Sequence, residues 1–252
     1  MLALQELVKQ LDTLLDSQSF KDYCPNGLQV EGRPQVRKIA TAVTASQNIL
    51  DQAVAEGVDA LLVHHGYFWK NESQTLTGMK YRRLSTLIKN DISLLAYHLP
   101  LDAHNELGNN VELARILDWQ VTDGLDAGNP RSIGLVGSAK RDKTLGQITE
   151  RIHRELDREP LVIGELSKEI NKIGWCTGAA QGFIEQAADA GCDLYISGEI
   201  SENTVHAARE LGVAYIAAGH HATERYGVLA LGRWLQDNYG IEHITLDEKN
   251  PV

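Results

Sequence analysis

The feature that most constrains the fold is a repeated pattern in which a helical segment is followed by a strand. Residues 44–65 read TASQNILDQAVAEGVDALLVHH, and residues 178–199 read GAAQGFIEQAADAGCDLYISGE. Placed one over the other, the two segments keep their apolar positions and are identical at Ala45/Ala179, Gln47/Gln181, Gln52/Gln186, Ala53/Ala187, Gly57/Gly191 and Asp59/Asp193. The alternative is a chance likeness of two unrelated helix–strand units. We favour an internal repeat, which predicts two similar α/β halves.

The pattern around the first copy extends this prediction. Short apolar runs at residues 38–44, 59–63 and 92–97 alternate with helical segments at 46–56 and 80–90. Strands that alternate with helices form a parallel sheet with covering helices. A second series has predicted strands at 172–177, 193–197 and 213–218 and predicted helices at 181–190, 202–210 and 222–237. The fold class is therefore α/β, with two similar interlinked domains.

A segment rich in glycine, asparagine, proline and serine separates the two series. It covers residues 126–132 and is typical of a domain boundary. We expect a first α/β domain over residues 1–125 and a second over 126–252. The last apolar piece, residues 241–246, is a candidate closing strand that could pack back on the first domain.

Composition excludes several function classes. The formal net charge is −10, and so acidic a surface makes nucleic acid an unlikely partner, although bound metal could still attract small anions. The three cysteines lack metal-site spacing and form no disulfide framework. We find no signal peptide and no apolar stretch long enough to span a membrane, so a reducing cytoplasm is the expected location.

Histidines gather where the predicted strands end. His64 and His65 follow the run Leu61-Leu62-Val63 directly. Ligands of open α/β sheets bind outside the carboxyl ends of strands, and two adjacent imidazoles that diverge suit two metal ions better than one. The alternative is a loop pair, with one histidine solvated and one bonded to the backbone.

The next strand is followed by His98 and Asp102. Asp102 is a candidate metal ligand, although a carboxylate at such a place is more often a helix cap or turn residue. His98 could reach the same pocket, where it would donate a hydrogen bond to a ligand or move protons.

The second copy of the repeat ends in comparable residues. His220 and Glu224 match His98 and Asp102 in spacing and would lie one turn apart on a helix that begins near His220. A glutamate at such a place is otherwise a common helix-start residue. Glu199 occupies the place of the histidine pair and is a candidate acid/base group, or else another helix-start carboxylate.

Together these positions offer three imidazoles and two carboxylates as metal ligands: His64, His65, Asp102, His220 and Glu224. Mixed nitrogen and oxygen ligands suit two divalent ions of iron, zinc, manganese, cobalt or nickel without choosing among them. Such paired sites activate water.

Several motifs occur in a fixed order along the chain: Pro25-Asn-Gly-Leu-Gln-Val-Glu-Gly32, Val63-His-His-Gly-Tyr-Phe-Trp69, His98-Leu-Pro-Leu-Asp-Ala-His104, Gly108-Asn-Asn110, Ile196-Ser-Gly-Glu199 and Ala218-Gly-His-His-Ala-Thr-Glu224. Jointly they resemble the NIF-three-like family, and most closely its short bacterial YbgI-type members. The resemblance covers nearly the whole chain.

The resemblance implies a ring-shaped homohexamer, a trimer of dimers, with the metal sites facing an inner cavity. It implies that Glu224 bridges two ions, that His64 and Asp102 hold one ion, and that His65 and His220 hold the other. Members are often called GTP cyclohydrolase I type 2 homologues, a label that does not fix the substrate.

The leading hypothesis is a dinuclear metal-dependent hydrolase that acts on an unknown small-molecule substrate, with a cyclohydrolase-like reaction as its candidate chemistry. His98 and Glu199 are the candidate proton-transfer residues. The competing hypotheses are a non-enzymatic metal-handling or metal-delivery protein and a ring-shaped scaffold.

Overall fold

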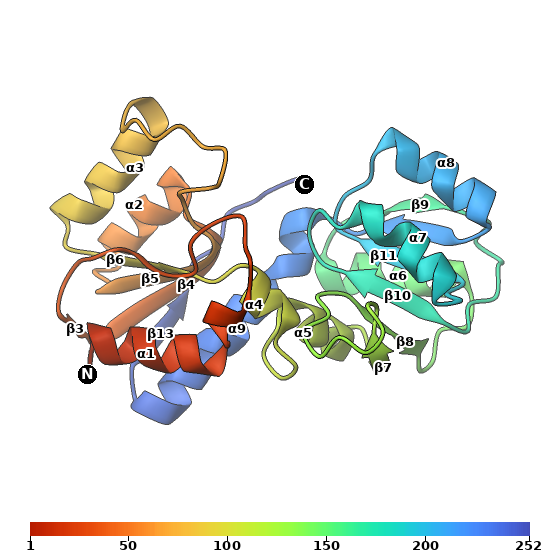
Figure 1. The fold of residues 1–252 in the computed structure, drawn as a ribbon, viewed down its shortest axis with the longest axis horizontal. Coiled ribbons are helices and arrows are strands. Elements are labelled where there is room, and N and C mark those ends of the chain that lie inside the picture. Colours follow the sequence, from red (N-terminus) through yellow and green to blue (C-terminus); the bar gives the residue numbers. More distant parts are fainter. The chain divides into compact units, whose positions relative to one another are not determined.

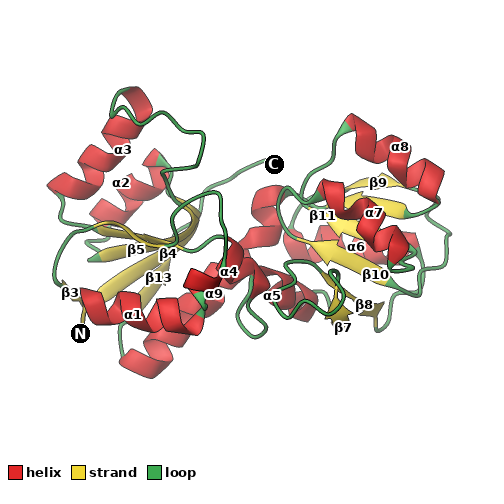
Figure 2. Ribbon diagram, in the orientation of Figure 1, coloured by secondary structure: helices red, strands yellow, loops and turns green.

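The computed structural model describes residues 1–252, which form two compact units of mixed α/β structure (Figures 1 and 2). The first unit comprises residues 1–101 and 227–249, and the second comprises residues 102–226 and 250–252. Each unit has its own sheet and its own helices. The predicted α/β class is confirmed.

The sheet of the first unit is mainly parallel, in the order β13-β4-β5-β6-β2. Only β2 runs antiparallel to its neighbour, β6. The bounds are β2 Gly27–Val30, β4 Lys38–Thr44, β5 Ala60–His65, β6 Ser93–Ala96 and β13 Glu242–Thr245. A small separate pair joins β1 (Leu2–Ala3) to β3 (Gln35–Val36).

Helices cover both faces of this sheet (Figure 1). Helices α2 (Gln47–Ala55) and α3 (Gly78–Lys89) lie on one side, and α1 (Leu4–Leu14) lies on the other with the later part of α9 (His220–Tyr239). Helix α1 buries Leu4, Leu7 and Leu11, whose spacing places them on one helical face. A short 3₁₀ turn, Ser17–Ser19, follows α1.

The sheet of the second unit has the order β7-β8-β10-β11-β12-β9, with a parallel centre of β10, β11 and β12 and antiparallel strands on both sides. The bounds are β7 Trp119–Gly124, β8 Leu135–Ala139, β9 Leu161–Ile163, β10 Ile173–Cys176, β11 Leu194–Ser197 and β12 Ala214–Ala217. The helices are α4 Leu99–Ala103, α5 Asn109–Ile116, α6 Leu145–Leu156, a 3₁₀ turn Gln181–Phe183, α7 Ile184–Asp189 and α8 Glu202–Leu211. The division between the two units falls within α4.

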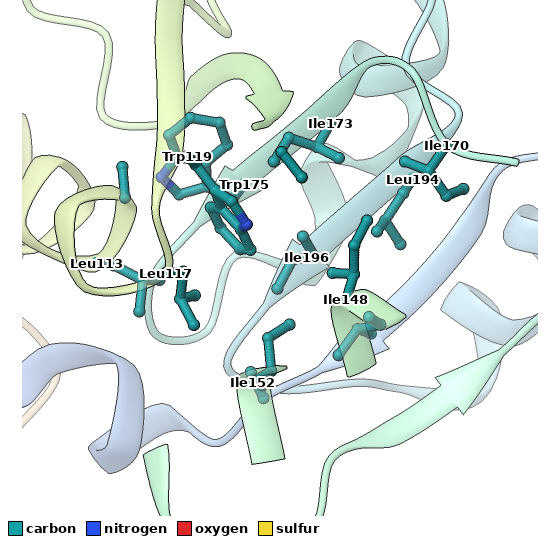
Figure 3. Packing of buried hydrophobic residues seen from close by; sticks show 14 of the residues in the cluster. Leu113, Leu117, Trp119, Ile148, Ile152, Ile170, Ile173, Trp175, Leu194 and Ile196 are labelled. Carbon is teal, nitrogen blue, oxygen red and sulfur yellow. The ribbon is translucent and has the colours of Figure 1, made fainter. Parts of the chain in front are cut away.

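Both faces of this second sheet are apolar, because alternate strand residues pack on different helices. One face joins Leu194 and Ile196 to Ile148 of α6 and to Trp119 and Trp175, whose ring centroids lie 5.2 Å apart (Figure 3). The other face is formed by residues such as Tyr195, Tyr215 and Ala187. A sheet buried on both sides explains why its central strands read as continuous apolar runs.

The internal repeat is present in the structure. The series β4-α2-β5-α3-β6 and β10-α7-β11-α8-β12 place three parallel strands in the same order. Asp59 accepts hydrogen bonds from the backbone N–H groups of residues 37 and 38, and Asp193 accepts them from residues 171 and 172. Identical residues thus make the same contacts in both copies.

The division of the chain differs from the expected boundary between residues 125 and 126. Residues 102–125 belong to the second unit because β7 pairs with β8 of that sheet. Residues 227–249 belong to the first unit because β13 pairs with β4. The segment of residues 126–132 is a connection between β7 and β8, and its turn-forming composition marks that connection.

All three cysteines are buried and free. None of the helices is both long enough and apolar enough to cross a membrane.

Candidate metal centre

Three imidazoles converge at one edge of the first sheet; we call His64, His65 and His98 the imidazole group. His64 and His65 are the last two residues of β5, and His98 follows the neighbouring parallel strand β6. One ring nitrogen of each histidine lies within 4.8 Å of the others. The carboxyl ends of parallel strands meet at one edge of a sheet, which is why residues distant in sequence come together here.

Each imidazole of this group is oriented through its Nδ1 atom. His64 Nδ1 lies 2.9 Å from the Tyr97 carbonyl oxygen, and His65 Nδ1 lies 3.2 Å from the Thr44 hydroxyl. A carbonyl oxygen can only accept, so Nδ1 of His64 carries a proton, which leaves the lone pair of the neutral ring on Nε2. Metal-binding histidines are commonly held in this way.

His98 is held by the segment that contains Asp22 and Asn26. Its Nδ1 lies 2.7 Å from Asp22 Oδ1, and its backbone N–H donates to Asn26 Oδ1. Burial acts to raise the pKa of Asp22, but hydrogen bonds from His98, Asn26 and the Tyr23 N–H outweigh it and lower the pKa below its usual value. Asp22 therefore stays ionised and fixes the His98 ring.

The second unit brings together carboxylates and one imidazole; we call Asp102, Glu199, His220 and Glu224 the mixed group. Helix α9 begins at His220, so Glu224 lies one turn later on the same face, and its Oε2 is 3.1 Å from His220 Nε2. Glu199 Oε1 lies 2.7 Å from the other ring nitrogen, Nδ1. A carboxylate oxygen of Asp102 lies within 4.8 Å of one of Glu224.

This arrangement favours positive charge at His220. Burial acts to lower the pKa of the imidazole, but the carboxylates of Glu224 and Glu199 outweigh it and raise the pKa to about 9. The same carboxylates would stabilise a metal cation, for which a proton on His220 would be the competitor.

Asp102 lies in the short helix α4, and a network of hydrogen bonds holds it. Its Oδ1 accepts from Asn109 Nδ2 at 2.9 Å and from the Thr177 hydroxyl at 3.3 Å. Asn110 donates to the Asp102 carbonyl and accepts from the Thr177 N–H. Helix α5 begins at Asn109, and the side chains of Asn109 and Asn110 both hold the Asp102 segment.

Gly178 supplies the space that the mixed group needs. It has a φ of +69°, and a Cβ at this position would overlap the Glu224 carboxylate and approach His220 Nε2 to 3.2 Å. Its N–H donates to Thr223 Oγ1, and that hydroxyl donates to the Gly219 carbonyl. Thr223 thus lies inside α9 and anchors the Gly178 loop.

The residues present fit a divalent transition metal ion. Imidazole nitrogens and carboxylate oxygens suit zinc, iron, manganese, cobalt and nickel. Because Gly178 has no side chain, it leaves space beside the two candidate ligands of α9, His220 and Glu224. The first unit therefore contains a cluster of three imidazoles that could bind metal, and the second unit places the Glu224 carboxylate beside both His220 and Asp102.

The sequence model of the Duf34/NIF3 (NGG1p interacting factor 3) family matches residues 2–251. The chain belongs to the Duf34/NIF3 family. The resemblance that its motifs predicted is thereby confirmed.

Individual relatives agree with this placement. A Pseudomonas aeruginosa protein named "GTP cyclohydrolase 1 type 2 homolog" is 56% identical over 251 residues, which cover 100% of this chain and 99% of that protein. The solved structure of protein ybgI, described as of unknown function, is 45% identical, with a TM-score of 0.95 and full coverage of both chains. The crystal structure of TTHA1606 from Thermus thermophilus is 36% identical, with a TM-score of 0.88 and full coverage of both chains.

Sequence reasoning missed the residues that hold the candidate ligands in place, chiefly Asp22, Asn110, Thr177 and Gly178. Asn26 likewise holds a candidate residue, because its Oδ1 accepts a hydrogen bond from the His98 N–H. The one available signal was position, because Thr177 ends the predicted strand of residues 172–177 and Gly178 directly follows it, as His64 and His65 follow the predicted strand of residues 59–63. Their small side chains gave no reason to look further.

Proposed function

We propose that this member of the Duf34/NIF3 family is a dinuclear metal-dependent hydrolase, with His64, His65, Asp102, His220 and Glu224 as its metal ligands. The ligand set takes His64 and His65 from the imidazole group and Asp102, His220 and Glu224 from the mixed group. Glu224 would bridge the pair, His64 and Asp102 would hold one ion, and His65 and His220 would hold the other.

The observation that carries the proposal is that each unit gathers metal-ligating side chains at the carboxyl edge of its own parallel strands. The first unit supplies oriented imidazoles, and the second supplies a His-x-x-x-Glu pair on α9 and a buried Asp102. Three imidazoles alone bring no charge to balance two divalent cations, whereas the carboxylates do. The two groups are therefore complementary in chemistry.

When bound, the ions would polarise a substrate oxygen and lower the pKa of a water molecule, which is the chemistry of paired-metal hydrolases. The protein's own residues have supporting roles. Glu199 orients the His220 ring through Nδ1, and Asn109 and Thr177 orient Asp102. His98, whose ring is fixed by Asp22, is placed to move a proton near the imidazole group.

The relatives' name suggests a reaction class to test. A cyclohydrolase opens a ring by adding water to a polarised carbon, which a paired-metal site could support. We propose a purine nucleotide such as GTP as the first substrate to screen, together with other small cyclic amidines, amides and phosphate esters.

The first test is metal content and hydrolysis by protein prepared without chelators. We expect two equivalents of one transition metal per chain and hydrolysis of one of the screened substrates. Glu224→Gln should lose at least one equivalent and all metal-dependent hydrolysis, because the amide cannot bridge two cations. Glu202→Gln is the matched control: Glu202 is an exposed glutamate in the first turn of α8.

Two results would contradict the proposal. One is a folded Glu224→Gln variant that keeps both equivalents and full hydrolysis. The other is a wild-type protein that holds two ions but hydrolyses nothing and passes its metal rapidly to a chelator. The second result would indicate metal handling instead of catalysis.

A further inference from the structure

The three imidazoles of the first unit form a set that the five proposed ligands do not use in full. His98 is outside that ligand set, yet one of its ring nitrogens lies within 4.8 Å of ring nitrogens of both His64 and His65. The ring centroid of His98 lies 5.1 Å from that of His64 and 5.8 Å from that of His65. All three residues belong to one unit.

We propose that the imidazole group binds one divalent transition metal ion without help from the second unit, with His98 as the third ligand. This ion would be the first to enter, before the five-ligand site is complete. The order of filling rests on the proposed function, whereas the binding of one ion by three imidazoles does not.

The hydrogen bonds of the group favour ligation through Nε2. His64 Nδ1 faces the Tyr97 carbonyl oxygen, and His98 Nδ1 faces the Asp22 carboxylate. Both partners are acceptors, so each neutral ring carries its proton on Nδ1 and its lone pair on Nε2. His65 Nδ1 contacts the Thr44 hydroxyl, which can accept in the same way. All three rings can therefore present the same type of donor atom.

The Asp22 carboxylate fixes the orientation of the His98 ring, as a metal ligand requires. Asp22 accepts four hydrogen bonds, from the N–H groups of Tyr23 and Leu99, from Asn26 Nδ2 and from His98 Nδ1. A carboxylate on the distal nitrogen of a ligating imidazole fixes the ring and increases its basicity. Because its oxygens already accept four bonds, Asp22 acts as a positioning residue and not as a ligand.

The composition of the group determines which ions it would hold and how firmly. Three neutral imidazoles prefer zinc, cobalt, nickel, copper or ferrous iron over magnesium and calcium, which prefer oxygen ligands. Without a carboxylate ligand the group leaves the charge of the ion unbalanced. We therefore expect weaker binding and faster exchange than at the complete five-ligand site, as suits a site of entry.

The proposal is tested by replacing the proposed ligands of the second unit and measuring how many metal ions the protein still binds. The variant Asp102→Asn/His220→Ala/Glu224→Gln keeps the whole imidazole group. We expect it to bind one equivalent of Co²⁺ or Zn²⁺, measured by calorimetry and by the visible spectrum of Co²⁺. Adding His98→Ala should weaken this binding by about tenfold or more. Adding His153→Ala, an exposed histidine on α6, is the matched control and should change nothing.

The single variant His98→Ala tests the order of filling in an otherwise complete protein. It should still bind two equivalents at equilibrium, but it should take up the first ion more slowly in stopped-flow measurements with Co²⁺. Uptake at the wild-type rate would overturn the entry role.

Other outcomes would overturn the site itself. A folded triple variant that binds no ion shows that the imidazole group does not suffice. Binding that survives His64→Ala but is lost in Cys24→Ser would move the ion to Asp22, Cys24 and His98, which also lie within 4.8 Å of one another. Failure of the proposed function is distinct, since it appears in the wild-type protein as a missing second equivalent or as absent hydrolysis, and neither result changes the binding of one ion by the triple variant.

Discussion

The two copies of the helix–strand repeat share their scaffold and differ in their chemistry. Asp59 and Asp193 each tie the start of a strand to the strand beside it through two backbone N–H groups. Gly57 and Gly191 end the preceding helix with φ values of +64° and +73°. At the other end of the same strands, the first copy has His64 and His65 where the second has Gly198 and Glu199.

This difference separates two kinds of constraint. Strand starts and helix ends are governed by backbone geometry, which is the same in both copies, so the same residues recur. Strand ends face the candidate site, where the side chain is set by what it has to bind. The candidate site residues of the first unit are imidazoles, and those of the second unit are mainly carboxylates.

The largest expected effect on metal affinity is at Gly178. This residue has a positive φ and also lies against the Glu224 carboxylate and His220. Gly178→Ala would place a Cβ against the Glu224 carboxylate at a positive φ. We expect metal affinity to fall by about 100-fold and the free energy of unfolding to fall by about 1–2 kcal/mol. Titration calorimetry and chemical denaturation measure the two effects.

Gly191→Ala provides the matched control for this prediction. Gly191 has a similar positive φ of +73°, but a Cβ there meets nothing within 4 Å. It should lose about 1 kcal/mol of stability and keep its metal affinity. Equal losses of affinity in both variants would mean that backbone strain, and not the space beside Glu224, is responsible.

Asp59 should contribute more to the free energy of unfolding than Asp193, although both accept hydrogen bonds from the backbone of the neighbouring strand. Asp59 also forms an ion pair with Arg33 at 2.8 Å, which has no counterpart at Asp193. We expect Asp59→Asn to lower the free energy of unfolding by about 2–3 kcal/mol, and Asp193→Asn by about 1–2 kcal/mol. Urea denaturation of both variants at pH 7 would test this order.

The effect of Asp59 should also depend on pH. Burial acts to raise the pKa of Asp59, but hydrogen bonds from the N–H groups of residues 37 and 38 and from Arg33 outweigh it and lower the pKa below its ordinary value. Its contribution is therefore complete above the ordinary pKa of about 4 and is lost as the pH falls through the lower folded value. The difference between wild type and Asp59→Asn should shrink at acid pH; a constant difference would contradict the role of the charge.

The smallest effect concerns the start of the repeated helix. Ser46 caps α2 by accepting a hydrogen bond from the Ile49 N–H at 3.2 Å, whereas the equivalent Ala180 makes no side-chain cap. Ser46→Ala should cost about 1 kcal/mol of stability.

The reverse change, Ala180→Ser, should alter stability by less than about 0.5 kcal/mol. The backbone at Ala180, with φ −103° and ψ 21°, is not the extended conformation that a capping serine adopts. Thermal unfolding of both variants would check this pair, and a clear gain from Ala180→Ser would show that the two helix starts are more alike than their backbones indicate.

The sequence by itself determined the α/β class, the repeat and the strand-end positions of the candidate ligands. These follow from local periodicity, because an apolar run and an amphipathic helix each leave a pattern in consecutive residues. The helical spacing of His220 and Glu224 could be foreseen for the same reason, and α9 does begin at His220.

Only the tertiary structure decided which segments share a sheet and which polar groups support the site. Strand β13 joins the first sheet by pairing with β4, which lies far earlier in the chain, and β7 leaves the expected first domain to pair with β8. The bonds of Asp22 to His98 and of Asn110 to Thr177 likewise join distant segments. Such contacts depend on how strands order themselves in space, and no pattern in neighbouring residues records that order.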